Sequence, residues 1–457
     1  MAAKSFLILL PVVLVVIGCS SAAQPASQSA IPFSGRPAPT ASAGRNSASQ
    51  YIQHVVIIIQ ENRSFENFFA GYPGANAPLY GYAKRGHRRV KIELRQTTFE
   101  TESDLPHNWQ DAIRDWDKGK MDGFLLGPPS SHAAYTYMDH SEIAPYWTMA
   151  KQYVLADALY PTELGGSYTA HLTAVAGTDN LSATVAEVNF PTHPPNDCDA
   201  PAGTRSSTVD SYRQVGRGNG PFPCFTQFNT MAELLDTAGI SWKYYVTRHL
   251  NGGIWSPFEA ISYTRYSKDW NEDVIAPGRK VLSDVRDGNL ASVSWVTPTV
   301  KNSDHPGAHS DTGPSWVTSI VNEIGESQFW NSSAVIVIWD DWGGLFDNAP
   351  PPQLDFRGLG IRVPCLIISP YAKTGYVSHV QYEFGSLLRF IEEVNGLTLG
   401  GIGPTSEGYT DGRANSLDDA FDFTQSPRKF SPIHSKYPAT YFLHGPSSSD
   451  DEPVDPE

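Results

Sequence analysis

Two continuous apolar runs stand out in the pattern of hydrophobic and polar positions along the chain. Residues 54–60 read His-Val-Val-Ile-Ile-Ile-Gln, and residues 334–339 read Ala-Val-Ile-Val-Ile-Trp. A run that is apolar at nearly every position indicates a strand buried on both faces, which occurs in parallel sheets covered by helices. We therefore expect both runs to be strands of one central sheet.

Shorter strand and helix patterns alternate through most of residues 51–400. The expected strands include 154–157, 241–246, 293–296 and 363–368, and the expected helices include 230–239, 316–329 and 384–395. This alternation is typical of a doubly wound α/β fold with a mostly parallel sheet. The 38 glycines and 35 prolines indicate long, shaped loops on that scaffold.

Oxygen-bearing side chains follow both long apolar runs. Glu61 and Asn62 come directly after the first, and Asp340 and Asp341 come directly after the second. In open α/β sheets ligands bind beyond the carboxyl ends of the strands. Adjacent carboxylates repel each other, and a cation between them keeps both ionised at low cost. The pattern predicts a divalent metal site, with a solvated loop as the alternative.

A turn from strand to helix places one serine where a nucleophile could stand. Ser167 follows Gly165 and Gly166, so that backbone N–H groups at the helix start could face an incoming anion. The pattern is not Gly-x-Ser-x-Gly, because Thr169 occupies the last position. His171, four residues on, shares a helix face with Ser167. The alternatives are a serine N-cap and a packed histidine.

Three further histidines lie in loops that contain Pro and Asp: His107, His305 and His309. The last two follow the strand predicted at 293–296. A histidine beyond the carboxyl end of a strand could protonate a leaving oxygen or hold a phosphate oxygen. The alternative for each of them is a structural role.

The N-terminus has the pattern of an export signal. Residues 1–18 form a lipoprotein-type signal peptide, and Cys19 after Gly18 resembles the lipidated cysteine of a lipobox. The alternative is an ordinary signal cut near Ala22 or Ala23. Either reading predicts an exported protein, in a bacterial cell envelope or secreted.

The composition of residues 19–457 predicts a tether, one folded domain and a tail. Residues 19–50 are rich in Ala, Ser, Pro and Gly, as in a flexible tether, 51–430 form a single folded domain, and 431–457 form an acidic, disordered tail. The net charge of −15 disfavours a nucleic-acid partner, although a bound metal can invert the field locally.

Export permits disulfides, so the cysteines beyond the signal can be interpreted. Cys198 and Cys224 flank a loop rich in Gly, Ser, Pro and Arg and are plausible partners. Cys365 lies in an apolar run, which indicates a buried free thiol.

Several motifs in a fixed order resemble the bacterial phosphoesterase family, which includes phosphatidylcholine-type phospholipases C and related acid phosphatases. The matching stretches are 60–69, 105–107, 120–124, 303–306, 340–348, 358–364, 368–373 and 389–393. The resemblance covers about residues 52–400. It implies an alkaline-phosphatase-like core, with 51–430 as a phosphoesterase catalytic domain.

The resemblance also implies a set of site residues. One divalent metal ion would be held by Glu61, Asn62, Ser167, Asp340 and Asp341, with Ser167 also the nucleophile that forms a phosphoenzyme. His107 and His305 would bind phosphate or protonate the leaving group, and His171 and His309 are the candidates for substrate binding. The substrate would be a phosphate ester, either a phosphomonoester or a phospholipid headgroup.

The chain departs from the family pattern around the expected nucleophile. Ala170 replaces an amide, His171 replaces an arginine, Asp341 replaces the usual Glu, and Asn348 replaces a frequent His. The alternative function is a non-catalytic envelope lipoprotein that binds phosphate or phospholipid. A sulfatase is less favoured, because the Cys/Ser-x-Pro-x-Arg motif is missing. The sequence after the catalytic region shows no long β-rich extension, which leans toward a phosphatase-like esterase.

Overall fold

The computed structural model describes residues 48–445, apart from 128–131, 222–223, 228 and 251–252. All of these residues belong to one compact unit. The predicted signal peptide, Cys19 and most of the tether lie outside the described residues, as do residues 446–457 of the predicted tail. Within the described part, helices long and apolar enough to cross a membrane are absent.

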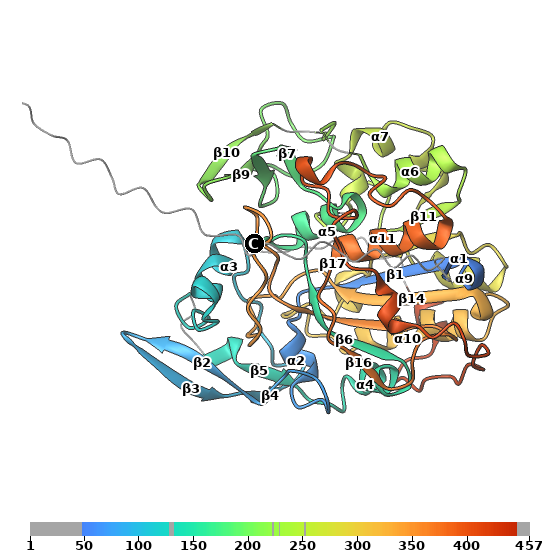
Figure 1. Ribbon diagram of the computed structural model, residues 1–457, viewed down its shortest axis with the longest axis horizontal. Coiled ribbons are helices and arrows are strands. Elements are labelled where there is room, and N and C mark those ends of the chain that lie inside the picture. The colour runs from blue at the N-terminus through green and yellow to red at the C-terminus, as the bar shows by residue number, and fades with distance from the viewer. Residues whose placement is uncertain (1–47, 128–131, 222–223, 228, 251–252, 446–457) are drawn as a thin grey trace, which may run out of the picture. The chain divides into compact units, whose positions relative to one another are not determined.

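A nine-stranded sheet forms the centre of the described structure (Figure 1). Its strand order is β12 (Val274–Ile275), β11 (Trp242–Tyr245), β13 (Val293–Val296), β1 (His54–Gln60), β14 (Ser333–Trp339), β15 (Val363–Ile368), β6 (Val154–Tyr160) and β16 (Tyr376–Ser378), with β17 (Tyr382–Glu383) also pairing with β6. Only β15 runs antiparallel to its neighbours in this sheet. The predicted mostly parallel α/β fold is therefore confirmed.

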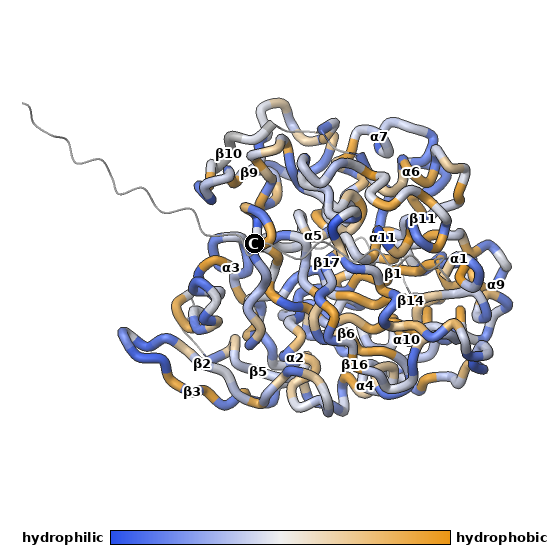
Figure 2. The backbone as a smooth tube through the Cα atoms, viewed as in Figure 1, coloured by the Kyte–Doolittle hydropathy of each residue, from blue (hydrophilic) through white to orange (hydrophobic). Residues whose placement is uncertain are grey.

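Helices cover both faces of this sheet. Figure 1 shows α5 and α11 on one side of the strands and α4 and α10 on the other. On the first side α11 packs against α5 and α1, and α6 packs against α5; on the second α10 packs against α4, α9 and α12. The bounds are α1 (Ala48–Tyr51), α4 (Ala144–Gln152), α5 (Ser167–Ala176), α6 (Met231–Ala238), α9 (Lys280–Arg286), α10 (Gly313–Gly325), α11 (Phe384–Asn395) and α12 (Ala439–Leu443). Burial on both sides explains the continuous apolar runs of the central strands, which Figure 2 shows in orange.

The parallel register of β1 and β14 positions the candidate site. Gln60 pairs with Trp339 at the carboxyl ends of the two strands. The next residues, Glu61 and Asp340, therefore leave the sheet side by side, and the backbone N–H of Asp340 donates to the Gln60 carbonyl at 3.0 Å.

Smaller elements complete the described structure. They are α2 (Phe65–Phe69), α3 (Trp109–Trp116), α7 (Ser262–Arg265), α8 (Asp269–Glu272), the hairpin of β2 (Tyr80–Arg85) and β3 (Arg88–Glu93), the pair β4 (Arg95–Thr97) and β5 (Thr136–Met138), and a four-stranded sheet of β7 (Asn180–Ser182), β8 (Val185–Glu187), β9 (Arg205–Asp210) and β10 (Val215–Pro221).

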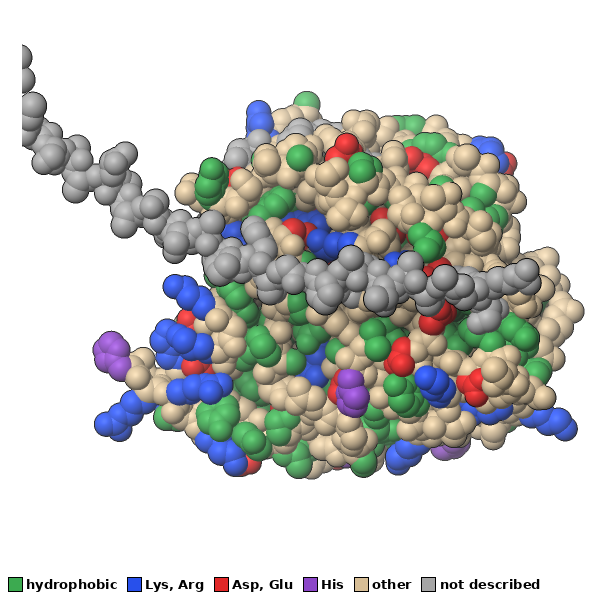
Figure 3. Space-filling model, in the orientation of Figure 1, with side chains coloured by type: hydrophobic (Ala, Val, Ile, Leu, Met, Phe, Trp, Pro, Cys, Tyr) green, Lys and Arg blue, Asp and Glu red, His purple; other side chains and the backbone are tan. Residues whose placement is uncertain are grey.

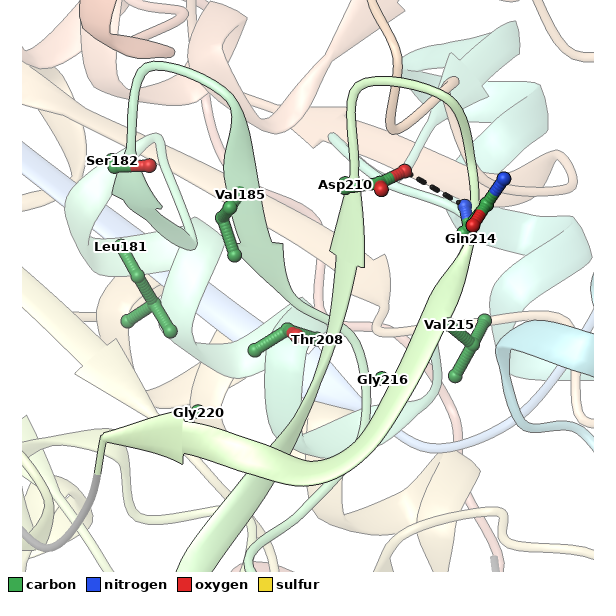
Figure 4. Close-up of a pocket in the computed structure, with 9 residues that line it drawn as sticks. All are labelled: Leu181, Ser182, Val185, Thr208, Asp210, Gln214, Val215, Gly216 and Gly220. Atoms are coloured by element: carbon green, nitrogen blue, oxygen red, sulfur yellow. Dashed lines mark hydrogen bonds between the residues drawn. The ribbon is translucent and has the colours of Figure 1, made fainter. Parts of the chain in front are cut away.

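The four-stranded sheet carries a cavity of about 510 Å³ (Figure 4). Its lining includes Leu181, Val185 and Val215. Asp210 and Gln214 also line it, and Asp210 Oδ1 accepts a hydrogen bond from the backbone N–H of Gln214 at 2.9 Å. Its lining residues do not include any of the candidate site residues.

The cysteines occur as expected. Cys198 and Cys224 form a disulfide, and Cys365 on β15 is a buried free thiol. Burial raises the pKa of this thiol well above its ordinary value, so Cys365 is an inert packing residue at neutral pH.

The folded domain continues beyond residue 430. Ile433 and Phe442 are buried, and Asn322 of α10 exchanges two 2.9 Å hydrogen bonds with the backbone of Ile433. The ring of Phe442 packs against Trp316 with centroids 5.4 Å apart. The prediction of a disordered tail from residue 431 is therefore wrong for residues 433–443, because their apolar side chains complete the cover of α10.

Candidate active site

The carboxyl ends of β1 and β14 bring three acidic side chains and an amide together. Glu61, Asn62, Asp340 and Asp341 are all fully buried. Asn62 has a φ of 59°, and its backbone N–H donates to Asp340 Oδ1 at 2.9 Å. A Cβ at Gly343, whose φ is +59°, would lie 2.3 Å from the Asn62 carbonyl oxygen. The two loops therefore fit only with glycine at position 343.

His171 joins this acidic group from α5. Its Nε2 lies 3.0 Å from Glu61 Oε1 and 3.9 Å from Asp340 Oδ2. One ligand atom each of Glu61, His171 and Asp340 lies within 4.8 Å of the other two. Helical spacing explains the placement, since His171 is one turn after the first residue of α5.

The residues at this group fit a divalent metal ion. Two buried carboxylates side by side are electrostatically unfavourable unless a cation compensates them. Asp340 Oδ2 accepts no hydrogen bond from the described residues. Carboxylate oxygens with one imidazole nitrogen form a donor set suited to zinc, manganese or iron. His171 thus joins Glu61 and Asp340 as a candidate ligand, although the sequence predicted substrate binding for it. The helical spacing from Ser167 was the available signal.

Ser167 is buried at the start of α5, next to Asp341. Its Oγ donates to Asp341 Oδ2 at 3.2 Å, and Asp341 Oδ1 accepts the backbone N–H of Gly343 at 2.7 Å. The N-terminus of a ten-residue helix attracts anions through its free N–H groups and its dipole. A phosphate group approaching Ser167 would meet this favourable field.

His107 reaches the site through Asn62. Its Nδ1 lies 2.5 Å from the Leu105 carbonyl oxygen, and its Nε2 lies 2.8 Å from Asn62 Nδ2. A carbonyl oxygen only accepts, so Nδ1 carries the proton and Nε2 of the neutral ring accepts from the amide. His107 is therefore held in one tautomer.

His305 lies beside His107, with ring centroids 6.4 Å apart. Its Nδ1 lies 2.5 Å from the Pro306 carbonyl oxygen, and its ring lies 6.0 Å from that of Trp255. The Pro306 carbonyl only accepts, so the proton of the neutral ring is on Nδ1 and Nε2 is the basic atom.

A buried network holds the loop that carries His305. Asp304 has a φ of 70°, and its Oδ2 accepts from Tyr146 Oη at 2.6 Å and from Gln60 Nε2 at 3.3 Å. Arg63 Nε donates to the Asp304 carbonyl at 2.7 Å. Burial raises the pKa of Asp304 to about 6, while the Tyr146 hydroxyl and Arg63 oppose that rise. The role of Tyr146 was not predictable from the sequence, because Tyr146 lies 158 residues from Asp304.

Most of the predicted site residues lie in this region. They are Glu61, Asn62, His107, Ser167, His171, His305, Asp340 and Asp341. His309 is different: it is exposed, and its Nδ1 lies 2.8 Å from the Glu100 carbonyl oxygen. Its role in substrate binding stays a prediction.

Comparison with protein families gives the relationship of the chain. A family model described as "Phosphoesterase family" matches residues 52–398, which include the whole site described above. The chain belongs to this family. The family assignment made from the motifs is thereby confirmed.

Several curated proteins that are similar to this chain are named phospholipase C. The "Non-hemolytic phospholipase C" of Pseudomonas aeruginosa is 26% identical over 433 residues, which cover 81% of this chain and 57% of that protein. The "Phospholipase C A" of Mycobacterium tuberculosis is 26% identical over 440 residues, which cover 83% and 79%. The chain thus matches little more than half of the first relative's length.

Solved structures show weaker similarity. A protein "in the Alkaline Phosphatase Superfamily" from Vibrio parahaemolyticus gives a TM-score of 0.39 at 12% identity, covering 81% of this chain and 71% of that chain. "The lipoteichoic acid synthase LtaP" from Listeria monocytogenes gives 0.36 at 10% identity, covering 80% and 78%. Scores of this size do not establish a shared fold, so the fold class rests on the strand order given above.

Proposed function

We propose that this phosphoesterase hydrolyses a phospholipid-type phosphodiester through a covalent intermediate on Ser167. The supporting observation is the position of Ser167 at the start of α5, with its Oγ 3.2 Å from Asp341 and His171 one turn away beside Glu61 and Asp340. The phospholipase C names of the relatives favour a diester over a monoester. The proposal includes export and a lipid anchor at Cys19.

Glu61, His171 and Asp340 would hold one divalent metal ion, with Asp341, Ser167 and Asn62 beside them. When bound, the ion would act as a Lewis acid that offsets the charge of the substrate phosphate. The sequence-based ligand set is thereby extended to His171.

The first chemical step begins at the existing hydrogen bond between Ser167 and Asp341. Asp341 accepts the hydroxyl proton while Ser167 Oγ attacks phosphorus, so a bond from Oγ to phosphorus forms and the bond to the leaving glycerol oxygen breaks. A protonated His305, or His107 once its Nε2 is released from the Asn62 amide, donates a proton from Nε2 to that leaving oxygen. The α5 N-terminus stabilises the added negative charge.

The second step restores the serine. Water attacks phosphorus, the bond to Ser167 Oγ breaks, and the phosphorylated headgroup leaves. The histidine that donated its proton in the first step can accept the proton of the attacking water, and the Asp341 carboxyl group returns a proton to Oγ. Asn62 Nδ2 and the Leu105 carbonyl hold the ring of His107 in place beside His305.

The test compares hydrolysis of p-nitrophenyl phosphorylcholine and p-nitrophenyl phosphate by the intact protein, by Ser167→Ala and by Ser319→Ala. Ser319 is a buried serine of α10 that donates to the Ser315 carbonyl, is not one of the site residues, and serves as the matched control. We expect diester hydrolysis to fall at least about 10³-fold in Ser167→Ala and to change less than about twofold in Ser319→Ala.

Acid quenching during turnover should give a protein mass increased by the phosphorylated headgroup, which is absent in Ser167→Ala. Full activity of Ser167→Ala would refute the covalent step. Faster hydrolysis of the monoester would assign the site to a phosphatase instead. If neither ester is hydrolysed with several divalent metals supplied, a non-catalytic lipoprotein that binds phosphate or phospholipid becomes the better description.

A further inference from the structure

The β2–β3 hairpin is strongly basic although the chain is acidic. Residues 80–95 contain six Lys or Arg and one Glu, whereas the whole chain has a net charge of −15. We call this region the basic hairpin; its cationic residues are Lys84, Arg85, Arg88, Arg89, Lys91 and Arg95. Figure 3 shows Lys and Arg side chains gathered over the hairpin.

Strand alternation gives the hairpin two different faces. Ala83 and Ile92 are buried on the inner face. On the outer face Tyr82 pairs with Lys91 and Lys84 pairs with Arg89, and the tip carries Arg85 opposite Arg88. Tyr82, Lys84, Arg89 and Lys91 therefore point away from the buried face. Arg85 and Arg88 share the parity of the inner face, but at the tip they are exposed.

Aromatic rings lie among these cations. The Arg89 guanidinium lies 4.1 Å from the centre of the Tyr82 ring, and Lys91 Nζ lies 4.0 Å from the centre of the Tyr80 ring. Leu79, at the base of the hairpin, is 46% exposed, and Tyr80 is 36% exposed. The surface thus combines positive charge with exposed apolar and aromatic area.

Nearby carboxylates neutralise only part of this charge. Asp117 pairs with Lys84 at 3.0 Å, Asp122 with Arg89 at 3.5 Å, and Glu93 with Lys91 at 2.7 Å. Arg85 contacts Nε2 of His132 at 2.8 Å instead of a carboxylate. The adjoining turn adds Lys118 and Lys120, so a positive excess remains.

The hairpin packs directly against the active-site loop. A Cβ at Gly81 would lie 2.3 Å from the ring of Phe346, which shows how closely that ring covers the strand. Phe346 follows Asp340 and Asp341 on the loop after β14. Tyr135 Oη also donates to the Tyr82 carbonyl at 2.7 Å. The basic hairpin is therefore a neighbour of the candidate active site.

We propose that the basic hairpin binds the surface of an anionic lipid bilayer. Cations attract anionic headgroups, and Tyr80 and Leu79 can enter the interfacial region beside them. A nucleic acid is a poorer match, because a long polyanion would extend over the acidic remainder of the protein. The inference deepens the proposed function, on which its biological meaning rests, because it places the active site at the surface that holds a phospholipid substrate.

The test measures vesicle binding by the full chain carrying Ser167→Ala, which prevents hydrolysis, and Cys19→Ser, which prevents lipidation. Vesicles of phosphatidylcholine alone are compared with vesicles containing phosphatidylglycerol, at low and high salt. We expect tighter binding to the anionic vesicles by at least about tenfold, weakening steeply with salt. Arg85→Glu with Arg88→Glu should reduce that binding at least about tenfold.

Lys280→Glu with Lys429→Glu is the matched control, because both lysines are exposed and neither belongs to the hairpin. With Ser167 intact, the hairpin variant should hydrolyse a soluble ester at the unchanged rate and unfold at the unchanged temperature. Equal losses in the hairpin and control variants would overturn the proposal. So would equal binding to neutral vesicles, or tight binding to single-stranded DNA without binding to vesicles. Vesicle binding does not require turnover, so its failure is distinguishable from failure of the proposed reaction.

Discussion

One turn of α5 connects the two halves of the candidate active site at the scale of single residues. Ser167 contacts Asp341, and His171 contacts Glu61 and approaches Asp340. A helix places residues four apart on one face. The orientation of α5 that directs the Ser167 hydroxyl to Asp341 therefore also directs the His171 imidazole to Glu61 and Asp340. His171 is therefore better suited to bind a metal than to reach a phosphate in front of Ser167.

Replacing His171 by Asn should lower the affinity for the metal at least about tenfold, because one of three close ligand atoms is lost. Metal content per chain after dialysis, measured by elemental analysis, reports this directly. His309→Asn is the control, since His309 is exposed and contacts Glu100, and it should retain the metal. A His171→Asn protein with full metal content and a raised KM would instead support a phosphate contact.

The residues at the strand ends were predictable, because an apolar run followed by a carboxylate indicates both the strand and the position where the strand ends. Glu61 and Asp340 were found in this way. The role of His171 was not predictable, because it depends on how α5 is rotated toward β1. The sequence determines which residues share a helix face, and tertiary packing determines what that face meets.

At the scale of elements, three hydrogen bonds from other segments hold the loop after β13 in place. Tyr146 of α4 donates to Asp304, Arg63 donates to the Asp304 carbonyl, and the Glu61 backbone N–H donates to the Ser303 carbonyl at 2.9 Å. The loop thus connects α4 with the end of β1. His305 follows directly, so its orientation depends on these bonds.

Tyr146→Phe should decrease the free energy of unfolding by about 1–3 kcal/mol, because the buried Asp304 carboxyl loses the shorter of its hydrogen bonds from Tyr146 and Gln60. It should also lower kcat severalfold by loosening His305. Tyr245→Phe is the matched control: Tyr245 is buried and donates to Asp284 at 2.8 Å, outside the site. Denaturant unfolding and ester hydrolysis measure the two effects. Equal kcat values for both variants would contradict a positioning role for Tyr146.

Element prediction succeeded where the hydrophobic pattern was long and failed where a partner was distant. The runs at β1 and β14 identified the centre of the sheet, and alternation of strands and helices identified its class. The antiparallel direction of β15 has no signature in residues 363–368, since a buried strand is apolar in either direction. The tail boundary was misplaced because composition alone does not reveal that Ile433 packs on α10.

For the whole molecule, buried carboxyl groups make stability depend on pH. Burial raises the pKa of Asp115 to about 7, of Asp304 to about 6 and, with Asp411 nearby, of Glu392 to about 8. The pKa of Asp355 shifts in the opposite direction. Burial would raise it, but Arg357 and Arg413 together hold it well below the ordinary value. Its stabilising contribution is complete above about pH 4 and stays constant through neutral pH.

A carboxyl group with a raised native pKa keeps its proton in the folded protein at a pH where the unfolded chain has lost it. Folding is therefore favoured at low pH, and this contribution falls as pH rises through the native values of about 6–8. The net charge of −15 acts in the same direction, because repulsion grows as groups ionise.

We therefore expect the unfolding temperature to be several degrees higher at pH 6 than at pH 8, measured calorimetrically with a chelator present so that metal affinity does not contribute. Glu392→Gln should reduce that difference, because the variant carries no titrating group beside Asp411. The exposed Glu407→Gln should leave it unchanged. An unfolding temperature that rises from pH 6 to pH 8 would mean that Glu392 and its buried counterparts ionise as readily in the folded protein as in the unfolded chain.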